Sequence, residues 1–402
     1  MRGLLVAGFI SSAVIVCGQA PLARGIDGGV RLLPSDMAIF EGGEARKDLP
    51  CTVTPAKPML GFDLKFHTGY DIAVPMKELA GSENVLSIVF RVAPSNRSDE
   101  YVYFGHRFKV PALEDDAKGD AYLQGAFDVG EGSYHVDWLM KDRTERVCSF
   151  SWDSEAELPL KDKQIALAVN AGTIQRADGE QFREDPPVER ILSEPPLNVK
   201  VLVNFAPQKY ESAALQPADT SALVSILRQI ARDPHIGRFS IVAFNVQEQR
   251  VLYRQESGSR IDFPALGQAL ASLSLGTVDL KRLSQKHGDT EFLTDLIKQE
   301  VNSADPPDAL VFAGPKVMLD ANVPQEDLRE VGDVRYPVFY MNYNLNPQAA
   351  PWRDSISRAV HFFRGTEYTI SRPRDLWFAV SDLVSRVVKA KVGRTSLGVA
   401  TQ

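Results

Sequence analysis

The spacing of apolar residues along the chain changes near residue 178. Before this point apolar side chains recur at every second position, as in "NVLSIVFRV", "GSYHVDWLM" and "RVCSFSW", with turn residues between the runs. Several short alternating strands joined by turns are typical of an antiparallel sandwich. We therefore predict an Ig-like β-sandwich over residues 51–177. The preceding residues 19–50 are rich in Gly and Pro and are predicted to be irregular, with a short strand near 37–40.

Beyond residue 178 apolar strands alternate with amphipathic helices. "VKVLVNF", "DALVFAG" and "VFYMNY" are apolar runs, "RFSIVAFNVQEQRVLYRQ" has the pattern of a hairpin, and "TSALVSILRQIAR" and "RDLWFAVSDLVSRVV" have helical periodicity. This alternation predicts a doubly wound α/β domain over 199–390, with a mainly parallel sheet covered on both faces. The charged, proline-rich residues 178–198 are predicted to be a linker, and 391–402 a flexible tail.

The N-terminus has the pattern of a secretory signal. "MRGLLVAGFISSAVIVCGQA" places one early positive charge before an apolar stretch. That stretch is shorter than the roughly 20 residues of a spanning helix, so we predict a signal peptide over 1–18 and an exported protein, periplasmic or extracellular. Cys17 leaves lipid anchoring as an alternative. The bulky Val16 before it favours plain export, and no transmembrane span is expected in the mature chain.

The three cysteines are Cys17, Cys51 and Cys148. If Cys17 is removed with the signal peptide, two remain in a compartment where disulfides persist. We therefore predict a Cys51–Cys148 bridge, with two separate buried thiols as the alternative. On the chain-entropy model, a bridge that closes a loop of roughly 100 residues stabilises by about 4–5 kcal/mol.

Composition and motifs exclude several functional classes. The net charge of −7 and the pI near 5.5 argue against a nucleic-acid-binding protein, which usually has a basic face. The sequence contains no H-E-x-x-H, G-x-S-x-G or P-loop motif, so we predict neither catalytic residues nor a cofactor. His135 and Asp137 share one face of a strand, but a metal site needs three or four converging ligands.

The second half of the chain resembles the von Willebrand factor A-type domain. The similarity covers about residues 198–390 and rests on the order of strands and helices, on "HGDTEFLTDLI", and on the closing "ISRAVHFFRGTEYTISRPRDLWFAVSDLV". With the sandwich and the signal, the whole chain is similar to exported bacterial proteins that carry A-type-related domains.

The resemblance implies a metal site that this sequence does not preserve. In the family an Asp-x-Ser-x-Ser loop follows the first strand, and an Asp ends the fourth. Here Asn204, Ala206 and Gln208 occupy the loop positions and Ala313 replaces the second Asp, while Thr290 matches the family's distant Thr. Mg²⁺ prefers near-octahedral oxygen ligands, typically with carboxylate charge. The resemblance therefore implies an A-type fold without its metal ion.

Without a metal ion, recognition is expected at the loops on the carboxyl edge of the sheet, where open α/β sheets bind ligands. We predict a metal-free protein that binds or scaffolds a protein or cell-envelope partner. Two alternatives stay open, namely an exported hydrolase with a site in the same crevice, and a carbohydrate-binding sandwich that uses aromatic residues of "DEYVYFGHRF". The expected binding rim consists of Asn204, Gln208, Asp289, Thr290, Gly314, Asn342 and Asn344, although Asp289 also suits a helix cap and the asparagines suit a polar connecting loop.

Overall fold

The chain folds into two compact units, residues 1–179 and 180–402. The predicted signal peptide and Cys17 lie outside the residues that the structure, a computed structural model, describes. No helix among the described residues is both long enough and apolar enough to cross a membrane. The described residues are 20–21, 32–177, 181–191, 196–209, 212, 214–273, 275, 287–303, 305–319 and 321–399, with side chains described between 32 and 392.

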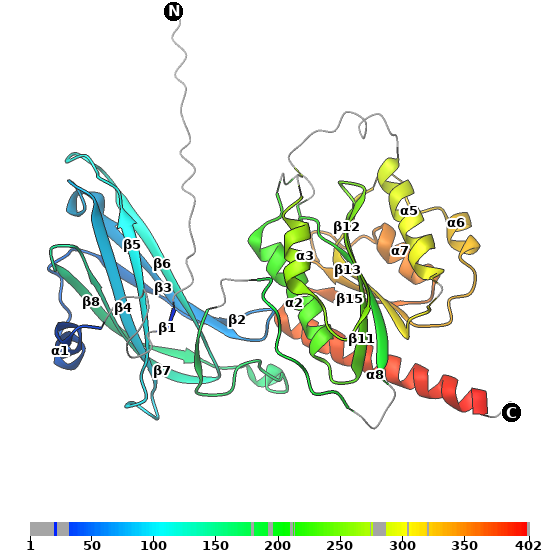
Figure 1. Cartoon of the computed structure of the whole chain (residues 1–402), viewed down its shortest axis with the longest axis horizontal. Helices are drawn as coiled ribbons and strands as arrows, with labels where there is room; N and C mark the ends of the chain where they lie inside the picture. Colours follow the sequence, from blue (N-terminus) through cyan, green and yellow to red (C-terminus); the bar gives the residue numbers. More distant parts are fainter. Residues whose placement is uncertain are drawn as a thin grey trace, which may run out of the picture. The chain divides into compact units, whose positions relative to one another are not determined.

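The first unit is the predicted antiparallel sandwich (Figure 1). One sheet has the order β1-β5-β4-β7-β8 and the other the order β2-β3-β6-β9, with every neighbouring pair antiparallel. The strands are β1 (Ala20–Pro21), β2 (Thr52–Leu60), β3 (Phe66–Pro75), β4 (Asn84–Pro94), β5 (Val102–Val110), β6 (Asp120–Val129), β7 (Gly132–Lys141), β8 (Val147–Ala156) and β9 (Ile174–Arg176).

Aromatic side chains from both sheets fill the sandwich. Tyr70 of β3 meets Phe90 and Trp138 of the opposite sheet edge to face, with ring centroids 5.5 Å apart in each pair. All three side chains are buried. Their positions follow from the two-residue period of each strand, because alternate residues point to the same face of a sheet.

The predicted disulfide is confirmed. Cys51 lies directly before β2 and Cys148 lies in β8, with 6.3 Å between their Cα atoms. The two strands belong to different sheets, so the bridge joins the two layers of the sandwich covalently.

The short strand predicted near 37–40 in the irregular lead-in is wrong, because the helix α1 (Pro34–Gly42) occupies this stretch. Phe40 packs against Val89 and Leu139 on the outer face of the five-stranded sheet. Asp36 pairs with Lys141 of β7 at 2.6 Å, and both side chains are buried. These contacts are tertiary, so the local sequence pattern did not reveal the helix.

The second unit is an α/β domain built on a six-stranded sheet in the order β12-β11-β10-β13-β14-β15. β12 at one edge is antiparallel to its neighbour, and the other pairs are parallel. Figure 1 shows α2 and α3 on one side of the sheet and α5, α6 and α7 on the other. The elements are β10 (Leu197–Asn204), α2 (Pro217–Arg232), β11 (Ile236–Asn245), β12 (Arg250–Gly258), α3 (Phe263–Leu270), α5 (Gly288–Val301), β13 (Ala309–Pro315), α6 (Gln325–Glu330), β14 (Val338–Tyr343), α7 (Ser355–Phe362), β15 (Thr366–Ile370) and α8 (Pro373–Val399).

The predicted linker and tail differ from the structure. Within the linker, residues 181–191 pack against the second unit: a Cβ on Gly267 of α3 would lie 2.6 Å from the Phe182 ring, and Asp185 pairs with Arg228 of α2 at 3.1 Å. Residues 391–399 of the predicted tail continue α8 as a helix. The described linker residues 181–191 are irregular, as expected of a connection, and the Asp185–Arg228 ion pair holds them to α2.

Candidate functional site

Strand ends that were expected to form an open rim are packed against one another. Gly314 at the end of β13 has a φ of +150°, and a Cβ there would lie 2.9 Å from Asn204 Cβ and 3.0 Å from Asn204 O. The Asn204 side-chain oxygen accepts a hydrogen bond from Val246 N at 3.3 Å. Asn204, Gly314 and Asn342 are all buried. These residues therefore hold the sheet edge together and are not presented to a partner.

The other predicted rim residues lie at two further places. Thr290 is buried, and its hydroxyl donates to Ala321 O at 3.0 Å. Asp289 accepts a hydrogen bond from Thr290 N at 2.8 Å in the first turn of α5, so neither residue caps this helix, whose N-cap position is His287. Gln208 donates to Tyr343 O at 3.4 Å, which ties the loop after β10 to the end of β14.

Among the described residues, the one group of three carboxylate or imidazole side chains close enough for a metal ion lies in the sandwich, not at this edge. His67 Nδ1 contacts Asp128 at 2.7 Å, and Nε2 contacts Asp63 at 3.0 Å. Lys65 Nζ lies 3.5 Å from Asp128 Oδ2. Burial alone would lower the pKa of His67, but hydrogen bonds to both carboxylates raise it to about 10. Two cations thus balance two carboxylates, and the group serves as an ion-pair network between β3 and β6.

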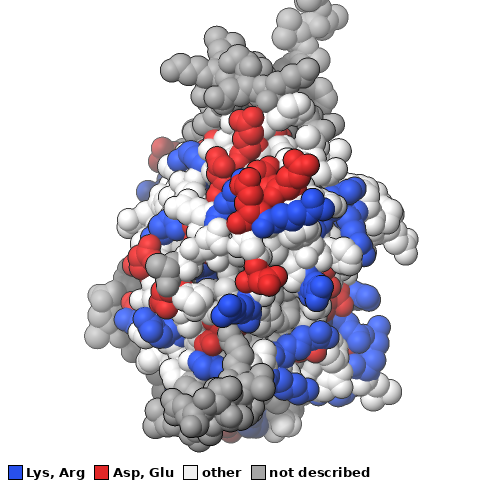
Figure 2. Space-filling view, turned by 90° about the vertical axis from the view of Figure 1, so that its right-hand side faces the viewer, with Lys and Arg blue, Asp and Glu red and all other residues white. Residues whose placement is uncertain are grey.

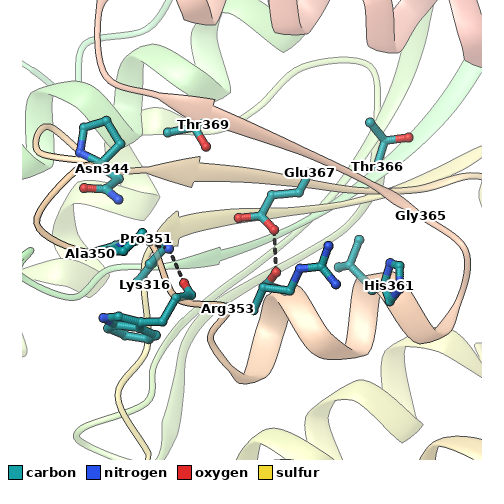
Figure 3. Close-up of a pocket in the computed structure, with 14 residues that line it drawn as sticks. Lys316, Asn344, Ala350, Pro351, Arg353, His361, Gly365, Thr366, Glu367 and Thr369 are labelled. Atoms are coloured by element: carbon teal, nitrogen blue, oxygen red, sulfur yellow. Dashed lines mark hydrogen bonds between the residues drawn. The ribbon is translucent and has the colours of Figure 1, made fainter.

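The carboxyl ends of β14 and β15 border a pocket of about 580 Å³, which is within the usual size range of small-ligand sites (Figure 3). Asn344 of the predicted rim lines it, and Asn342 hydrogen-bonds a lining side chain. The remaining lining residues come from the loop after β13, the loop after β14, α7, the turn before β15 and β15 itself: Lys316, Pro347, Ala350, Pro351, Trp352, Arg353, Ser357, Val360, His361, Gly365, Thr366, Glu367 and Thr369.

Lys316 shapes the loop on one side of the pocket. Its ammonium donates to Ala350 O at 2.6 Å and to Trp352 O, and it lies 5.2 Å from the centre of the Trp352 ring (Figure 3). The Trp352 side chain stays 38% exposed. Because its donors are used by backbone carbonyls, Lys316 holds the loop and keeps the indole at the pocket wall.

Glu367 of β15 is the acidic side chain that lines the pocket. Asn342 Nδ2 donates to one carboxylate oxygen at 2.8 Å, and the Ser357 hydroxyl donates to the other. Both donors are neutral. Within the described part of the chain no Lys, Arg or His side chain pairs with Glu367, although the residue is half buried. Among the described residues, this carboxylate is therefore held by neutral hydrogen-bond donors.

A second carboxylate lies directly behind the pocket. Asp354 is buried and accepts hydrogen bonds from Val317 N at 2.7 Å, from Ser357 N at 2.8 Å and from the Tyr340 hydroxyl at 3.2 Å. Burial raises the pKa of Asp354 to about 6, and the nearby negative charge of Glu367 adds to the rise. Lys316, Arg353 and His361 line the same pocket, so its lining carries both signs of charge.

The residues that line the pocket include one carboxylate, Glu367. Glycoside hydrolysis usually requires two carboxylates that flank the substrate, whereas Asp354 does not line the pocket and its oxygens are used inside the fold. Ser357 is buried, and its hydroxyl donates to the Glu367 carboxylate. The sequence pointed to the loop that contains Trp352 but missed Glu367, because a single acidic residue in a short strand carries no motif.

The aromatic residues considered for sugar binding do not form an exposed row. The Arg91 guanidinium lies 4.0 Å from the centre of the Tyr101 ring, and the Tyr103 hydroxyl contacts Met37 of α1. In the described sandwich the most exposed rings are Tyr122 at 74% and Phe150 at 36%, which lie in different sheets. A flat platform of adjacent rings is therefore not formed by these residues.

The surface drawn in Figure 2 has mixed charge. Figure 2 shows acidic and basic side chains next to one another on the visible face, without a continuous basic stripe. Lys298, for example, pairs with both Asp327 and Glu330. Proteins that bind nucleic acids non-specifically depend on clustered unpaired cations, and this face does not provide them.

Comparison with known proteins adds little. No family model and no curated protein matches the sequence. Among solved structures, the PilB minor pilin from Streptococcus sanguinis matches with 8% identity and a TM-score of 0.27, covering 77% of this chain and 88% of the pilin. A β-glucuronidase from Bacteroides uniformis matches with 9% identity and a TM-score of 0.19, covering 75% of this chain and 39% of the enzyme. At these scores the similarities support no conclusion about function.

Proposed function

We propose that the chain is an exported, non-catalytic binding protein that recognises a protein or cell-envelope partner at the pocket beside β15. The observation that carries this proposal is Glu367, a half-buried carboxylate without a cationic partner among the described residues, in a pocket of ligand-binding size. A cationic group supplied by the partner would complete the site, since charge-assisted hydrogen bonds are among the strongest polar contacts.

Two features support the remaining parts of the proposal. The Cys51–Cys148 disulfide favours export, because such bridges persist in oxidising compartments. The order of elements from β10 to α8 agrees with the A-type resemblance, and we propose that this unit is an A-type-like domain. Asn204 uses its side-chain oxygen on Val246 N, so binding is expected to be independent of divalent ions.

The proposal is tested by sedimentation of the purified full chain with the envelope fraction of its source cells. We expect saturable binding that EDTA leaves unchanged and that Glu367→Gln or Trp352→Ala weakens at least tenfold. Glu330→Gln and Tyr122→Ala are matched controls, because both residues are strongly exposed and lie outside the pocket. Binding that survives both pocket substitutions, or that disappears with EDTA, would contradict the proposal.

A further inference from the structure

The six-stranded sheet has an open edge at β15, whose one neighbour among the described strands is β14. Asn344 N donates to Ile370 O at 3.0 Å, so the backbone groups of Ile370 face β14. Successive residues of a strand direct their backbone groups to opposite sides. The N–H and C=O groups of Glu367 and Thr369 therefore point to the open edge.

This edge lacks the features that protect other sheet edges in the chain. Prolines, charged side chains (lysine above all) and bulges are among the features that keep edge strands from pairing with another chain. β2 contains Pro55, Lys57 and Pro58 together with a register shift. β12 contains Arg250 and Arg254 and also pairs with register shifts.

β15 reads Thr-Glu-Tyr-Thr-Ile and pairs with β14 over all five residues in unbroken register. It has no proline, no basic residue and no bulge. Its residues are largely of the β-branched and aromatic types that favour strands. A further strand could therefore pair with the open edge of β15.

The open edge and the pocket share residues. Glu367 and Thr369, whose backbone groups face outward, also line the pocket with their side chains. In Figure 3 Glu367 lies between Lys316 and His361. A strand placed along β15 would consequently bring alternate side chains towards the pocket, while its main chain bonds to the edge.

We propose that β15 accepts an extended segment of a partner protein as an added strand, and that a lysine or arginine of this segment enters the pocket and pairs with Glu367. Main-chain bonds then supply affinity and the pocket supplies specificity, as in other cases of strand addition. Lys316, Arg353 and His361 also line the pocket, but among the described residues none of them forms an ion pair with Glu367, and the Lys316 ammonium binds Ala350 O and Trp352 O. This inference rests on the proposed function and assigns it a partner class and a binding mode.

The test uses the full chain and synthetic heptapeptides of alternating threonine and valine with a central lysine, arginine or norleucine. Isothermal titration should show that the lysine and arginine peptides bind about tenfold or more tightly than the norleucine peptide, the difference expected for a charge-assisted hydrogen bond. Glu367→Gln should remove this preference, and Glu330→Gln should keep it.

Strand addition is separated from side-chain binding by N-methylation of the lysine peptide. Methylation of one set of alternate residues should abolish binding, and methylation of the other set should leave it nearly unchanged. Amide hydrogen exchange of Glu367 and Thr369 should slow in the complex, whereas Tyr368, whose backbone already faces β14, should change little.

Each outcome decides a part of the inference. Absence of binding by both basic peptides at millimolar concentration overturns it. Equal binding by both N-methylated sets refutes strand addition, and envelope binding that still depends on Glu367 would then leave the proposed function intact. Retention of the lysine preference in Glu367→Gln refutes the pairing with Glu367.

Discussion

Replacing Asp354 by asparagine is expected to destabilise the second unit more at pH 4 than at pH 7. The buried Asp354 carboxylate caps α7 through Ser357 N and also accepts from Val317 N. Asparagine can accept both bonds only through its single side-chain oxygen, and its amide would face a donor. Loss of one such bond costs about 1–3 kcal/mol at any pH.

The pH dependence follows from the raised pKa of Asp354. Its pKa is about 6 in the folded chain against 3.8 for an unperturbed group, because burial disfavours the charged form. The folded state therefore binds the proton more tightly than the unfolded state. Its stabilising contribution is complete below pH 3.8 and is lost as the pH rises through about 6. The shift corresponds to about 3 kcal/mol in total, and about 2 kcal/mol of this falls between pH 4 and pH 7.

Hydrogen exchange of β14 amides measures the opening free energy of the second unit in the full chain. We expect Asp354→Asn to lower this free energy by about 2 kcal/mol more at pH 4 than at pH 7, since asparagine does not titrate. Other titrating groups contribute equally to both chains and cancel in the difference. A mutational effect that is constant with pH, or larger at pH 7, would refute the assignment of a raised pKa to Asp354.

Two further substitutions test the fold. Gly314→Ala places a Cβ 3.0 Å from Asn204 O at a φ of +150° and should destabilise the second unit by about 1–3 kcal/mol. The control Gly332→Ala, with a φ of +75° and no atom within 4 Å of its added Cβ, should destabilise it less. Equal denaturation midpoints for the two variants would argue against the close contact at Gly314. Serine at both Cys51 and Cys148 should destabilise the sandwich by about 4–5 kcal/mol. A thiol titration of the unfolded, unreduced wild-type chain should find neither cysteine free, and two reactive thiols would exclude the bridge.

The sandwich could be predicted because burial on one face of each strand imposes a period of two on the sequence. The α/β sheet could be predicted because strands covered on both faces are continuous apolar runs between amphipathic helices. Tyr70, Phe90 and Trp138 occupy inward positions of their strands, and each is fully enclosed in the structure. α1 could not be predicted in this way, since its Asp36 and Phe40 are held by residues of β4 and β7 that are distant in sequence. Contacts with residues that are distant in sequence do not produce a periodic pattern of apolar residues in the local sequence.

The candidate site was predictable only in its location. The strand-end rule led to the loop after β14, and Asn344 does line the pocket. The same rule also selected Asn204 and Thr290, which are buried and bonded within the fold. Loop residues at a sheet edge have the same composition whether they face a ligand or tie strand ends together, so sequence alone does not separate these roles. Glu367 could be recognised only from the structure, which shows that among the described residues no Lys, Arg or His side chain pairs with its carboxylate.

The position of Glu367 explains why one residue can join the pocket and the open edge. Its backbone belongs to the unpaired side of β15, while Asn342 and Ser357 fix its carboxylate towards the pocket. Neutral donors orient the charge without cancelling it, and the buried Asp354 behind it adds to the negative potential. A structural ion pair would have been completed by a cation of the chain itself, as Lys141 completes Asp36 in the sandwich. The absence of such a partner among the described residues around Glu367 is what a site reserved for an incoming basic side chain requires.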